Sequence, residues 1–212
     1  MKESEKKIAH QLLQINAIKL NPAKPFTWAS GWKSPIYCDN RKTLSYPEVR
    51  SSICDGFVEI IRNKYPSADG IAGVATGAIA HGMLVADRLN LPFIYIRSDA
   101  KEHGLENLIE GHFESGQKFV IVEDLISTGG SSLKAVNALR SAGCKTLGMV
   151  AIFTYGFAIA VDNFLQANCP LDTLSNYEIL IEAASENGFV SESEIATLKE
   201  WRTAPDKWKQ IS

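Results

Sequence analysis

Residues 118–132 join an apolar run, two adjacent carboxylates and a turn of glycines and hydroxyl side chains. The apolar run, residues 119–122, is β-branched and aromatic without polar alternation, which predicts a strand buried on both faces of a parallel sheet. Glu123 and Asp124 follow at the carboxyl end of that strand, the edge at which open α/β sheets bind their ligands. The segment therefore predicts an α/β fold with a polar site beyond the ends of its strands.

The turn that follows the two carboxylates has the composition of a phosphate-binding loop. Residues 127–131 offer small hydroxyl groups, glycines that permit positive φ, and successive backbone N–H groups that lead into a predicted helix at 131–142. Such N–H groups at a helix N-terminus bind phosphate. The carboxylates would repel a phosphate, but they accept hydrogen bonds from the neighbouring hydroxyls of a ribose. The segment thus predicts a site for ribose plus phosphate, and the alternative is a strand, a turn and a helix N-cap without a ligand.

The central part of the chain alternates short apolar strands with helices. The pattern predicts strands at 71–74, 93–96, 119–122 and 146–153, and helices at 79–89 and 133–139. Such alternation implies βαβ units and a parallel sheet. Between them, residues 97–117 are polar and have few apolar anchors, which predicts a long mobile excursion of the functional kind.

The two ends of the chain read as helical segments that cover the sheet. We expect helices at 3–18, 47–63, 157–167, 177–184 and 191–202, the last of which starts with the capping box Ser191-x-x-Glu194. No repeat or linker divides the sequence, so we expect one domain over residues 1–212. Its core would span about 45–160, and a small hood would come from about 1–44 and 161–212.

Composition excludes several classes of function. The net charge of −2, the pI near 6.1 and the lack of a lysine and arginine cluster give no support to nucleic-acid binding. No apolar stretch approaches the ~20 residues of a membrane span, and residues 1–7 lack a secretory signal pattern, so we expect a cytoplasmic protein without a membrane partner. The four cysteines are scattered without a Cys-x-x-Cys pair, which predicts reduced thiols and no zinc site.

Three segments of the chain carry a resemblance to one family. Residues 118–132 resemble the phosphoribosyl diphosphate (PRPP) motif of type I phosphoribosyltransferases. Residues 26–41 are similar to the N-terminal signature of the orotate phosphoribosyltransferase family, and residues 97–104 with 109–111 look like its catalytic loop. The motifs occur in the family's order, and the resemblance covers nearly the whole chain.

The resemblance implies the type I phosphoribosyltransferase fold, a mostly parallel sheet flanked by helices under a hood. It also implies transfer of the phosphoribosyl group from PRPP to orotate with Mg²⁺, which would bind mainly through PRPP and not through a protein metal site. The catalytic residues would be Lys101, His103 and Asp124. The PRPP-binding residues would be Thr76, Gly77, Arg97, Lys101, His103, Glu123, Asp124, Leu125, Ile126, Ser127, Thr128, Gly129, Gly130 and Ser131.

These assignments differ in how far the residues alone support them. Vicinal hydroxyls of the ribose would bind Glu123 and Asp124, whose charge also favours an oxocarbenium-like centre. The turn at 74–78 is small and contains a glycine, as many α/β turns without ligands do. Charges such as those of Lys101 and His103 are ordinarily just solvated on a surface loop. Only the resemblance implies that this loop closes over PRPP from the neighbouring subunit of a homodimer, with Arg97 also reaching across.

The orotate site is the least defined part of the prediction. Ser127, Phe26, Tyr37 and Arg41 are its candidates, although aromatic residues at this spacing, Trp28 included, are more often part of a core. The chain departs from one branch of the family, since it has Ala29 and Ser98 where that branch carries lysines, and residues 154–156 lack a base-contacting arginine. The cation for the orotate carboxylate is therefore sought among Lys33, Arg41 and Lys42.

Two alternatives remain at this point. The PRPP motif alone does not choose the base, so a purine or another pyrimidine phosphoribosyltransferase is the nearest enzymatic alternative. A regulator that senses PRPP and binds nucleic acid is the alternative from another class, and the mild acidity of the chain argues against it.

Overall fold

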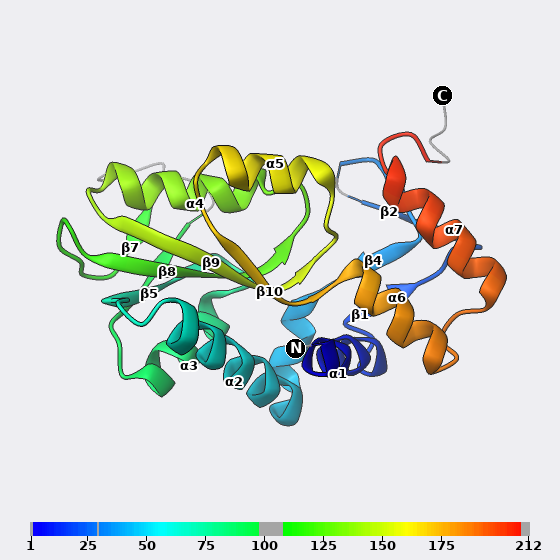
Figure 1. Cartoon of the computed structure of the whole chain (residues 1–212), viewed down its shortest axis with the longest axis horizontal. Helices are drawn as coiled ribbons and strands as arrows, with labels where there is room; N and C mark the ends of the chain where they lie inside the picture. Colours follow the sequence, from blue (N-terminus) through cyan, green and yellow to red (C-terminus); the bar gives the residue numbers. More distant parts are fainter. Residues whose placement is uncertain (1, 29, 98–107, 209–212) are drawn as a thin grey trace.

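A computed structural model describes residues 2–28, 30–97 and 108–208, and it is built on a six-stranded sheet (Figure 1). The strand order is β10-β9-β8-β5-β6-β7. All neighbouring pairs are parallel except β6 and β7, which are antiparallel. The strands are β5 (Gly70–Val74), β6 (Phe93–Ile96), β7 (Ile109–Glu110), β8 (Lys118–Ile126), β9 (Lys145–Thr154) and β10 (Leu171–Asn176).

The order of the strands reverses between β5 and β8. From β5 the chain crosses through α3 (Ile79–Leu89) to β6 on one side, and from β8 it crosses through α4 (Gly130–Ser141) to β9 on the other. The loops that leave the carboxyl ends of β5 and β8 therefore part and leave a crevice between them. This is the position at which doubly wound sheets bind ligands.

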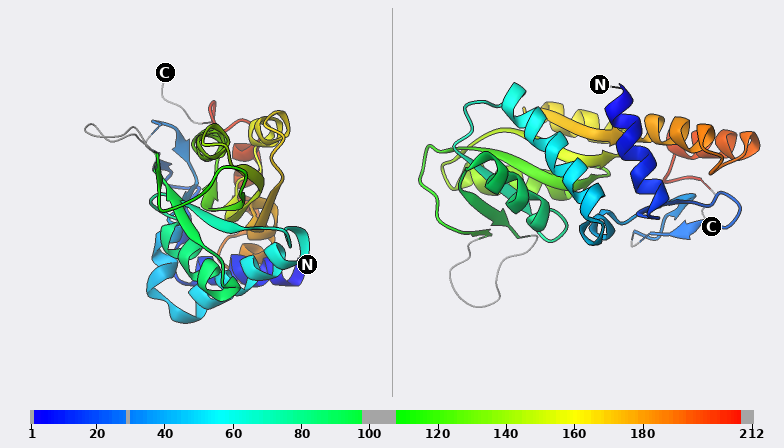
Figure 2. Two further views of the ribbon diagram at one scale, coloured as in Figure 1. Left: turned by 90° about the vertical axis from the view of Figure 1, so that its left-hand side faces the viewer. Right: turned by 90° about the horizontal axis from the view of Figure 1, so that it is seen from below.

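Helices cover both faces of the sheet (Figures 1 and 2). On one face lie α3 and α2 (Pro47–Lys64), and on the other lie α4 and α5 (Ala158–Gln166). Alternate residues of β8 enter two different cores: Val120 and Val122 pack on the side of α2 and α3, whereas Phe119 and Ile121 pack with α4 and α5. The unbroken apolar run of β8 is explained by burial on both sides, as predicted.

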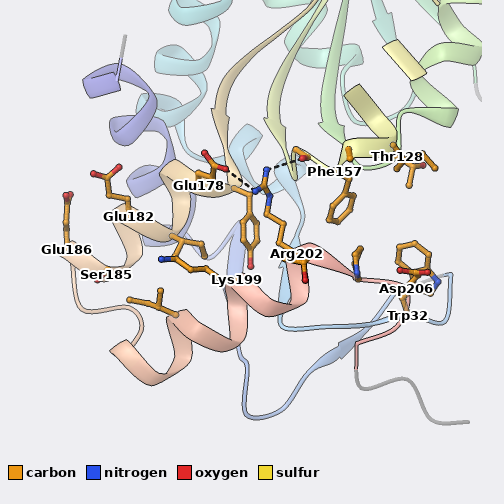
Figure 3. A pocket seen from close by; sticks show the side chains of 18 residues that line it. Trp32, Thr128, Phe157, Glu178, Glu182, Ser185, Glu186, Lys199, Arg202 and Asp206 are labelled. Carbon is orange, nitrogen blue, oxygen red and sulfur yellow. Dashed lines mark hydrogen bonds and ion pairs between the residues drawn. The ribbon is translucent and has the colours of Figure 1, made fainter. Parts of the chain in front are cut away.

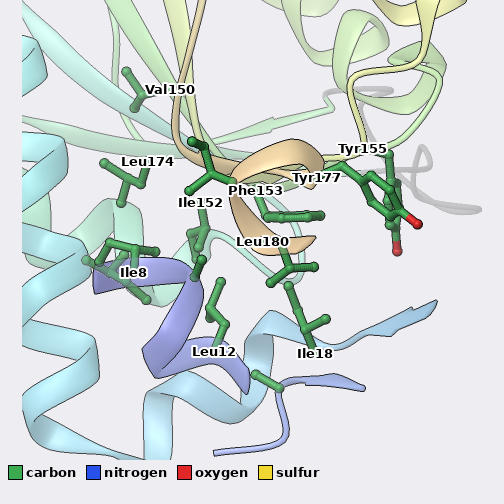
Figure 4. Packing of buried hydrophobic residues seen from close by; sticks show 14 of the residues in the cluster. Ile8, Leu12, Ile18, Val150, Ile152, Phe153, Tyr155, Leu174, Tyr177 and Leu180 are labelled. Carbon is green, nitrogen blue, oxygen red and sulfur yellow. The ribbon is translucent and has the colours of Figure 1, made fainter. Parts of the chain in front are cut away.

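Both ends of the chain build the hood beside the sheet. It contains α1 (Lys2–Gln14), the antiparallel pairs β1 (Ile18–Leu20) with β4 (Ile36–Cys38) and β2 (Phe26–Thr27) with β3 (Lys33–Ser34), α6 (Tyr177–Glu186) and α7 (Glu192–Thr203). The short 3₁₀ helix η1 (Asn40–Ser45) joins the hood to α2. Apolar side chains of α1, such as Ile8 and Leu12, pack with Ile152 of β9 and Leu180 of α6 and so attach the hood to the sheet (Figure 4).

The structure differs from the sequence prediction in several elements. The N-terminal helix ends at Gln14 instead of Ile18, because Asn16 takes a left-handed φ of 54° and the chain turns into β1. The four short strands of the hood and β7 were not predicted, since strands of two or three residues carry no readable alternation. The strand β10 was also missed, and it pairs with β9, so the sheet extends to Asn176 and the predicted hood boundary near residue 161 is too early.

Further expectations from the sequence concern a helix cap, the cysteines and membrane spans. The capping box of Ser191 and Glu194 is present at the start of α7. The four cysteines are free thiols. None of the helices in the described ranges combines the length and apolarity that a membrane crossing requires. Of the excursion at 97–117, residues 98–107 lie outside the described residues.

Candidate active site

A cavity of about 590 Å³ lies at the carboxyl ends of β5 and β8. Its walls come from the end of β5 and the turn after it, from the residue after β6, from β8 and the turn after it, and from the first turns of α4. The hood contributes Cys38, Asp39 and Arg41. The lining residues are Cys38, Asp39, Arg41, Val74, Ala75, Thr76, Gly77, Arg97, Glu123, Asp124, Leu125, Ser127, Thr128, Gly129, Ser131, Lys134 and Ala135. Most of the residues predicted to bind PRPP therefore share one cavity at the switch point of the sheet.

The two adjacent carboxylates of β8 occupy different environments. Both lie within the strand, which continues to Ile126, and not after its end as the sequence suggested. Glu123 is only 5% exposed, and its carboxylate accepts hydrogen bonds from the backbone N–H of Asp124 at 2.9 Å and from the Ser132 hydroxyl at 3.0 Å. Burial, followed by the nearby charge of Asp124, raises the pKa of Glu123 well above its usual range. Asp124 is the half-buried and more accessible carboxylate of the pair.

The turn after β8 presents backbone N–H groups to the cavity. Gly129 caps α4 with a left-handed φ of 83°, and a side chain there would also press on the ring of Phe164, with 2.9 Å between the two nearest carbons. In the described part of the chain no side chain caps this helix, so its first N–H groups stay available to an anion. The Asn163 side chain of α5 donates to the carbonyl oxygen of Thr128 at 2.9 Å and holds the turn from outside.

The turn after β5 forms the opposite wall. Thr76 and Gly77 line the cavity, and the Ala75–Thr76 peptide bond is cis. Arg97 follows β6 and lines the same cavity, where its guanidinium lies 3.6 Å from the Glu110 carboxylate. It therefore faces the cavity of its own chain, whereas the resemblance implied that it reaches toward the neighbouring subunit. The predicted catalytic residues Lys101 and His103 lie outside the described residues, so their roles stay predictions.

Comparison with known proteins identifies the family of this architecture. The model of the phosphoribosyl transferase domain family matches residues 51–180. A protein of Bacteroides fragilis named orotate phosphoribosyltransferase is 58% identical over 209 residues, which cover 99% of each chain. The chain belongs to the orotate phosphoribosyltransferase family. The resemblance drawn from the sequence motifs is thereby confirmed.

Solved structures agree with this assignment of fold. The orotate phosphoribosyltransferase of Aeropyrum pernix superimposes with a TM-score of 0.76 at 26% identity, covering 87% of this chain and 99% of that one. The UMP synthase of Leishmania donovani has a TM-score of 0.80 at 23% identity over 95% of this chain, which corresponds to 43% of that longer protein. The type I phosphoribosyltransferase fold predicted from the sequence is confirmed.

In this phosphoribosyltransferase the predicted orotate residues lie only partly at the cavity. Arg41 and Ser127 line it, whereas Phe26 and Tyr37 pack on each other at 5.7 Å between ring centroids and are not among its lining residues. Arg41 forms two hydrogen bonds with Asp39, from Nε at 2.7 Å and from Nη2 at 3.1 Å.

The remaining candidates for contact with the base are engaged elsewhere. The Lys33 ammonium donates to the Thr27 hydroxyl at 2.8 Å, and the Lys42 ammonium donates to the carbonyl oxygen of Asn16 at 3.1 Å. Trp28 packs at 5.1 Å from Tyr155 and donates from its indole to a backbone carbonyl, as a core residue does. Of the three cations considered for the orotate carboxylate, only Arg41 lines the cavity of the phosphoribosyltransferase.

Some site residues differ from the prediction in their surroundings. Neither Ile126 nor Gly130 is among the lining residues of the cavity. The Ile126 side chain is fully buried in the core, and Gly130 is the first residue of α4. Lys134 and Cys38 do line it, although sequence reasoning missed both. Lys134 lies three residues after Ser131 on the same helix, and this helical spacing was the signal that could have revealed it.

A larger cavity of about 1270 Å³ lies between the start of α5 and the helices α6 and α7 (Figure 3). It includes Thr128 but neither of the two β8 carboxylates. Arg202 of α7 crosses its wall, where it donates to the carbonyl oxygens of Tyr155 and Gly156 and to the Glu178 carboxylate. This arginine connects the hood to the end of β9. The larger cavity is lined by four other carboxylates, Glu178, Glu182, Glu186 and Asp206, but of the described residues predicted to bind PRPP it includes Thr128 alone.

Proposed function

We propose that this protein transfers the 5-phosphoribosyl group from PRPP to orotate and releases pyrophosphate, a step of de novo pyrimidine (UMP) synthesis. The ribose C1–O bond to pyrophosphate breaks, a C1–N bond to orotate forms, and the nitrogen loses its proton to give orotidine 5′-monophosphate. The observation that carries the proposal is the 58% identity over 99% of both chains to a protein named for this activity.

Asp124 is the carboxylate best placed to bind the ribose hydroxyls. It lines the cavity and is half-buried, whereas both oxygens of Glu123 already accept hydrogen bonds from the protein. A carboxylate next to the ribose favours the positive charge that develops as the C1–O bond breaks. Glu123 would contribute less directly, because it holds the Ser132 hydroxyl and so fixes the first turn of α4.

The 5′-phosphate would bind at the start of α4. The free N–H groups of this helix, the hydroxyls of Ser127, Thr128 and Ser131, and the glycine at its N-cap are suited to an anion. The helix dipole adds to the attraction. Lys134 on the next turn lines the same cavity and would add a positive charge.

The pyrophosphate would lie between the Thr76–Gly77 turn and Arg97, with Lys101 and His103 acting on it as the sequence predicts. Within the described ranges no cluster of three or more His, Cys, Asp or Glu side chains could enclose a metal ion. Oxygen ligands suit Mg²⁺, and the ion would bind mainly through PRPP, while Asp124 and Asp39, which line the same cavity, would accept hydrogen bonds from its waters. The ion would neutralise charge on the leaving group.

The orotate carboxylate would pair with Arg41. Two of its donors engage Asp39, and the planar guanidinium keeps further N–H groups for a second carboxylate. Phe26 and Tyr37 would meet the base only from the outer edge of the hood. A homodimer that shares its catalytic loops, and a cytoplasmic location, stay predictions from the sequence.

The test is a release assay for pyrophosphate with PRPP, Mg²⁺ and one base at a time. We expect turnover with orotate and little with uracil, hypoxanthine or xanthine. Turnover with a purine and none with orotate would overturn the proposal. Salt-dependent binding to RNA or DNA without any turnover would favour a regulatory role.

A further inference from the structure

Three polar side chains next to the cavity are buried without facing it. Asn40 and His81 are each 1% exposed, and Thr43 is fully buried. They come from two separate elements, since Asn40 and Thr43 belong to η1 and His81 belongs to α3. Buried polar groups carry a desolvation cost, so their mutual contacts require an explanation.

The directions of their hydrogen bonds follow from the donors available. The Thr43 hydroxyl donates to the carbonyl oxygen of Asn40 at 2.6 Å and lies 3.0 Å from Nε2 of His81. Because its only proton goes to Asn40, Thr43 accepts from His81, which fixes the proton of the ring on Nε2. Burial, followed by the charge of Arg50, lowers the pKa of His81 to about 4, so the ring is neutral near pH 7.

Asn40 extends the chain of hydrogen bonds to the reaction site. Its side-chain nitrogen donates to the carbonyl oxygen of Asp124 at 2.6 Å, and its side-chain oxygen accepts from the Cys38 thiol at 3.4 Å. Its neighbours in sequence, Asp39 and Arg41, line the cavity. One buried amide thus holds the peptide of Asp124 and anchors the segment that carries Arg41.

The far end of the chain reaches the opposite wall. His81 lies in the first turn of α3, the helix that begins directly after the turn containing Thr76 and Gly77. The hydrogen-bonded path from His81 through Thr43 and Asn40 therefore joins the two walls behind the cavity. Reacting groups must be held to within a fraction of an ångström, and supporting hydrogen bonds of this kind provide that precision.

We propose that Asn40, Thr43 and His81 form a positioning relay that fixes Asp124 and Arg41 relative to the Thr76–Gly77 turn. The inference rests on the proposed function for its readout. None of the three residues contacts the substrate; they act through the residues that do. The relay links α3 to β8 through the hood, so it defines the separation of the ribose and pyrophosphate positions.

The central test compares Thr43→Val with Thr43→Ser. Valine keeps the shape but removes the hydroxyl that both donates and accepts, whereas serine keeps it. We expect kcat/KM for PRPP to fall about tenfold in Thr43→Val and to stay within about twofold of wild type in Thr43→Ser. The matched control is Thr146→Val in β9, whose buried hydroxyl has no partner in the described structure and lies outside the cavity.

A second measurement separates positioning from a loss of folded protein. In the background of Asp124→Asn, the added Thr43→Val change should cost less than about twofold, because the residue that the relay positions is already impaired. The same tenfold loss in both backgrounds would overturn the relay. Should Thr43→Val fail to fold, His81→Gln, which keeps a donor, is compared with His81→Leu; equal activity of these two overturns it as well.

Measurements of wild-type turnover and of PRPP binding distinguish a failure of the proposed function from a failure of the relay. Absence of orotate turnover by the wild type would overturn the proposed function, and the relay is then judged from PRPP affinity measured by calorimetry in the same variants. Normal wild-type turnover with an unchanged Thr43→Val variant would overturn the relay alone.

Discussion

The carboxylate of Asp124 lies against the Cα of Gly77, so that the cavity walls formed by β8 and by the turn after β5 touch at one point. A Cβ built on Gly77 would overlap the whole carboxyl group of Asp124. Position 77 therefore needs glycine for lack of space, and not for a left-handed backbone. This contact joins the turn after β5 directly to β8, in addition to the relay behind the cavity.

A methyl group at position 77 tests this relationship. We expect Gly77→Ala to lower kcat/KM by about 10²-fold or more, because Asp124 must move from its working position. Steady-state kinetics with PRPP and thermal unfolding measure the two effects. The matched control is Gly56→Ala in α2, where the new methyl meets only the flexible end of Leu174, so activity should persist. Equal activity of the two variants would contradict the assigned geometry.

Strands β5, β8 and β9 were readable from the sequence because most of their residues are buried on both faces of the sheet. The apolar run at 119–122 predicted β8, and the glycines and hydroxyl side chains that follow the two carboxylates predicted the phosphate-binding turn. β10 was not readable, because Asp172, Thr173 and Ser175 interrupt its apolar residues. Its strand conformation comes from pairing with β9, a tertiary contact that local sequence does not encode.

The two β8 carboxylates should respond differently to neutralisation. Asp124→Asn is expected to lower kcat by about 10²–10³-fold, because a charge next to the developing cation is lost. Glu123→Gln should cost much less activity, since an amide fits between the Asp124 N–H and the Ser132 hydroxyl. Steady-state kinetics of both variants decide this, and a larger loss in Glu123→Gln would reverse the assigned roles.

The same Glu123→Gln variant carries a stability readout. The pKa of Glu123 is raised in the folded state, so its contribution is present at low pH and is lost as pH rises above the unfolded value. The variant should therefore unfold at higher temperature than wild type near neutral pH.

Acid should weaken the fold through His81. Its folded pKa of about 4 lies below the ordinary value of 6.5, so the unfolded chain takes up the proton first and stability falls as pH drops from 6.5 toward 4. The loss between pH 7 and pH 5 is about 2 kcal/mol for this residue. The free energy of unfolding in urea, measured for wild type and His81→Gln at both pH values, isolates the contribution of His81, because glutamine does not titrate. An identical pH dependence of the two proteins would contradict the burial of a neutral ring.

The cation that pairs with the orotate carboxylate could not be chosen from the sequence. From the sequence alone, Lys33, Arg41 and Lys42 are equally good candidates for the cation, and only the folded structure distinguishes them. The Lys42 side chain turns to the Asn16 carbonyl while Arg41 turns to the cavity, a result of the 3₁₀ geometry that places neighbouring residues on different sides. Nor could the sequence reveal that His81 and Thr43 meet behind the cavity, because 38 positions separate them in the chain.

The different directions of the Arg41 and Lys42 side chains allow a paired test of which cation binds the orotate carboxylate. Arg41→Gln should raise the KM for orotate at least tenfold, the effect of losing a charge-assisted hydrogen bond of about 1.5–3 kcal/mol, with a smaller change in the KM for PRPP. Lys42→Gln removes a charge from the adjacent position and should leave both values near wild type. A larger effect of Lys42→Gln would assign the orotate carboxylate to the other cation.

The predicted sharing of loops between subunits can be tested by mixing two inactive chains. Lys101→Ala removes the loop cation, and Asp124→Asn impairs the ribose wall. If each loop serves its neighbour's cavity, a mixed dimer has one site with both defects and one with neither. Random mixing in equal amounts makes half of the dimers mixed, so about a quarter of wild-type activity should return. If loops serve their own cavities, every site carries one defect and activity stays at the level of the parents. Co-expression with two different affinity tags isolates the mixed dimers, and no recovery in that fraction would contradict the shared loop.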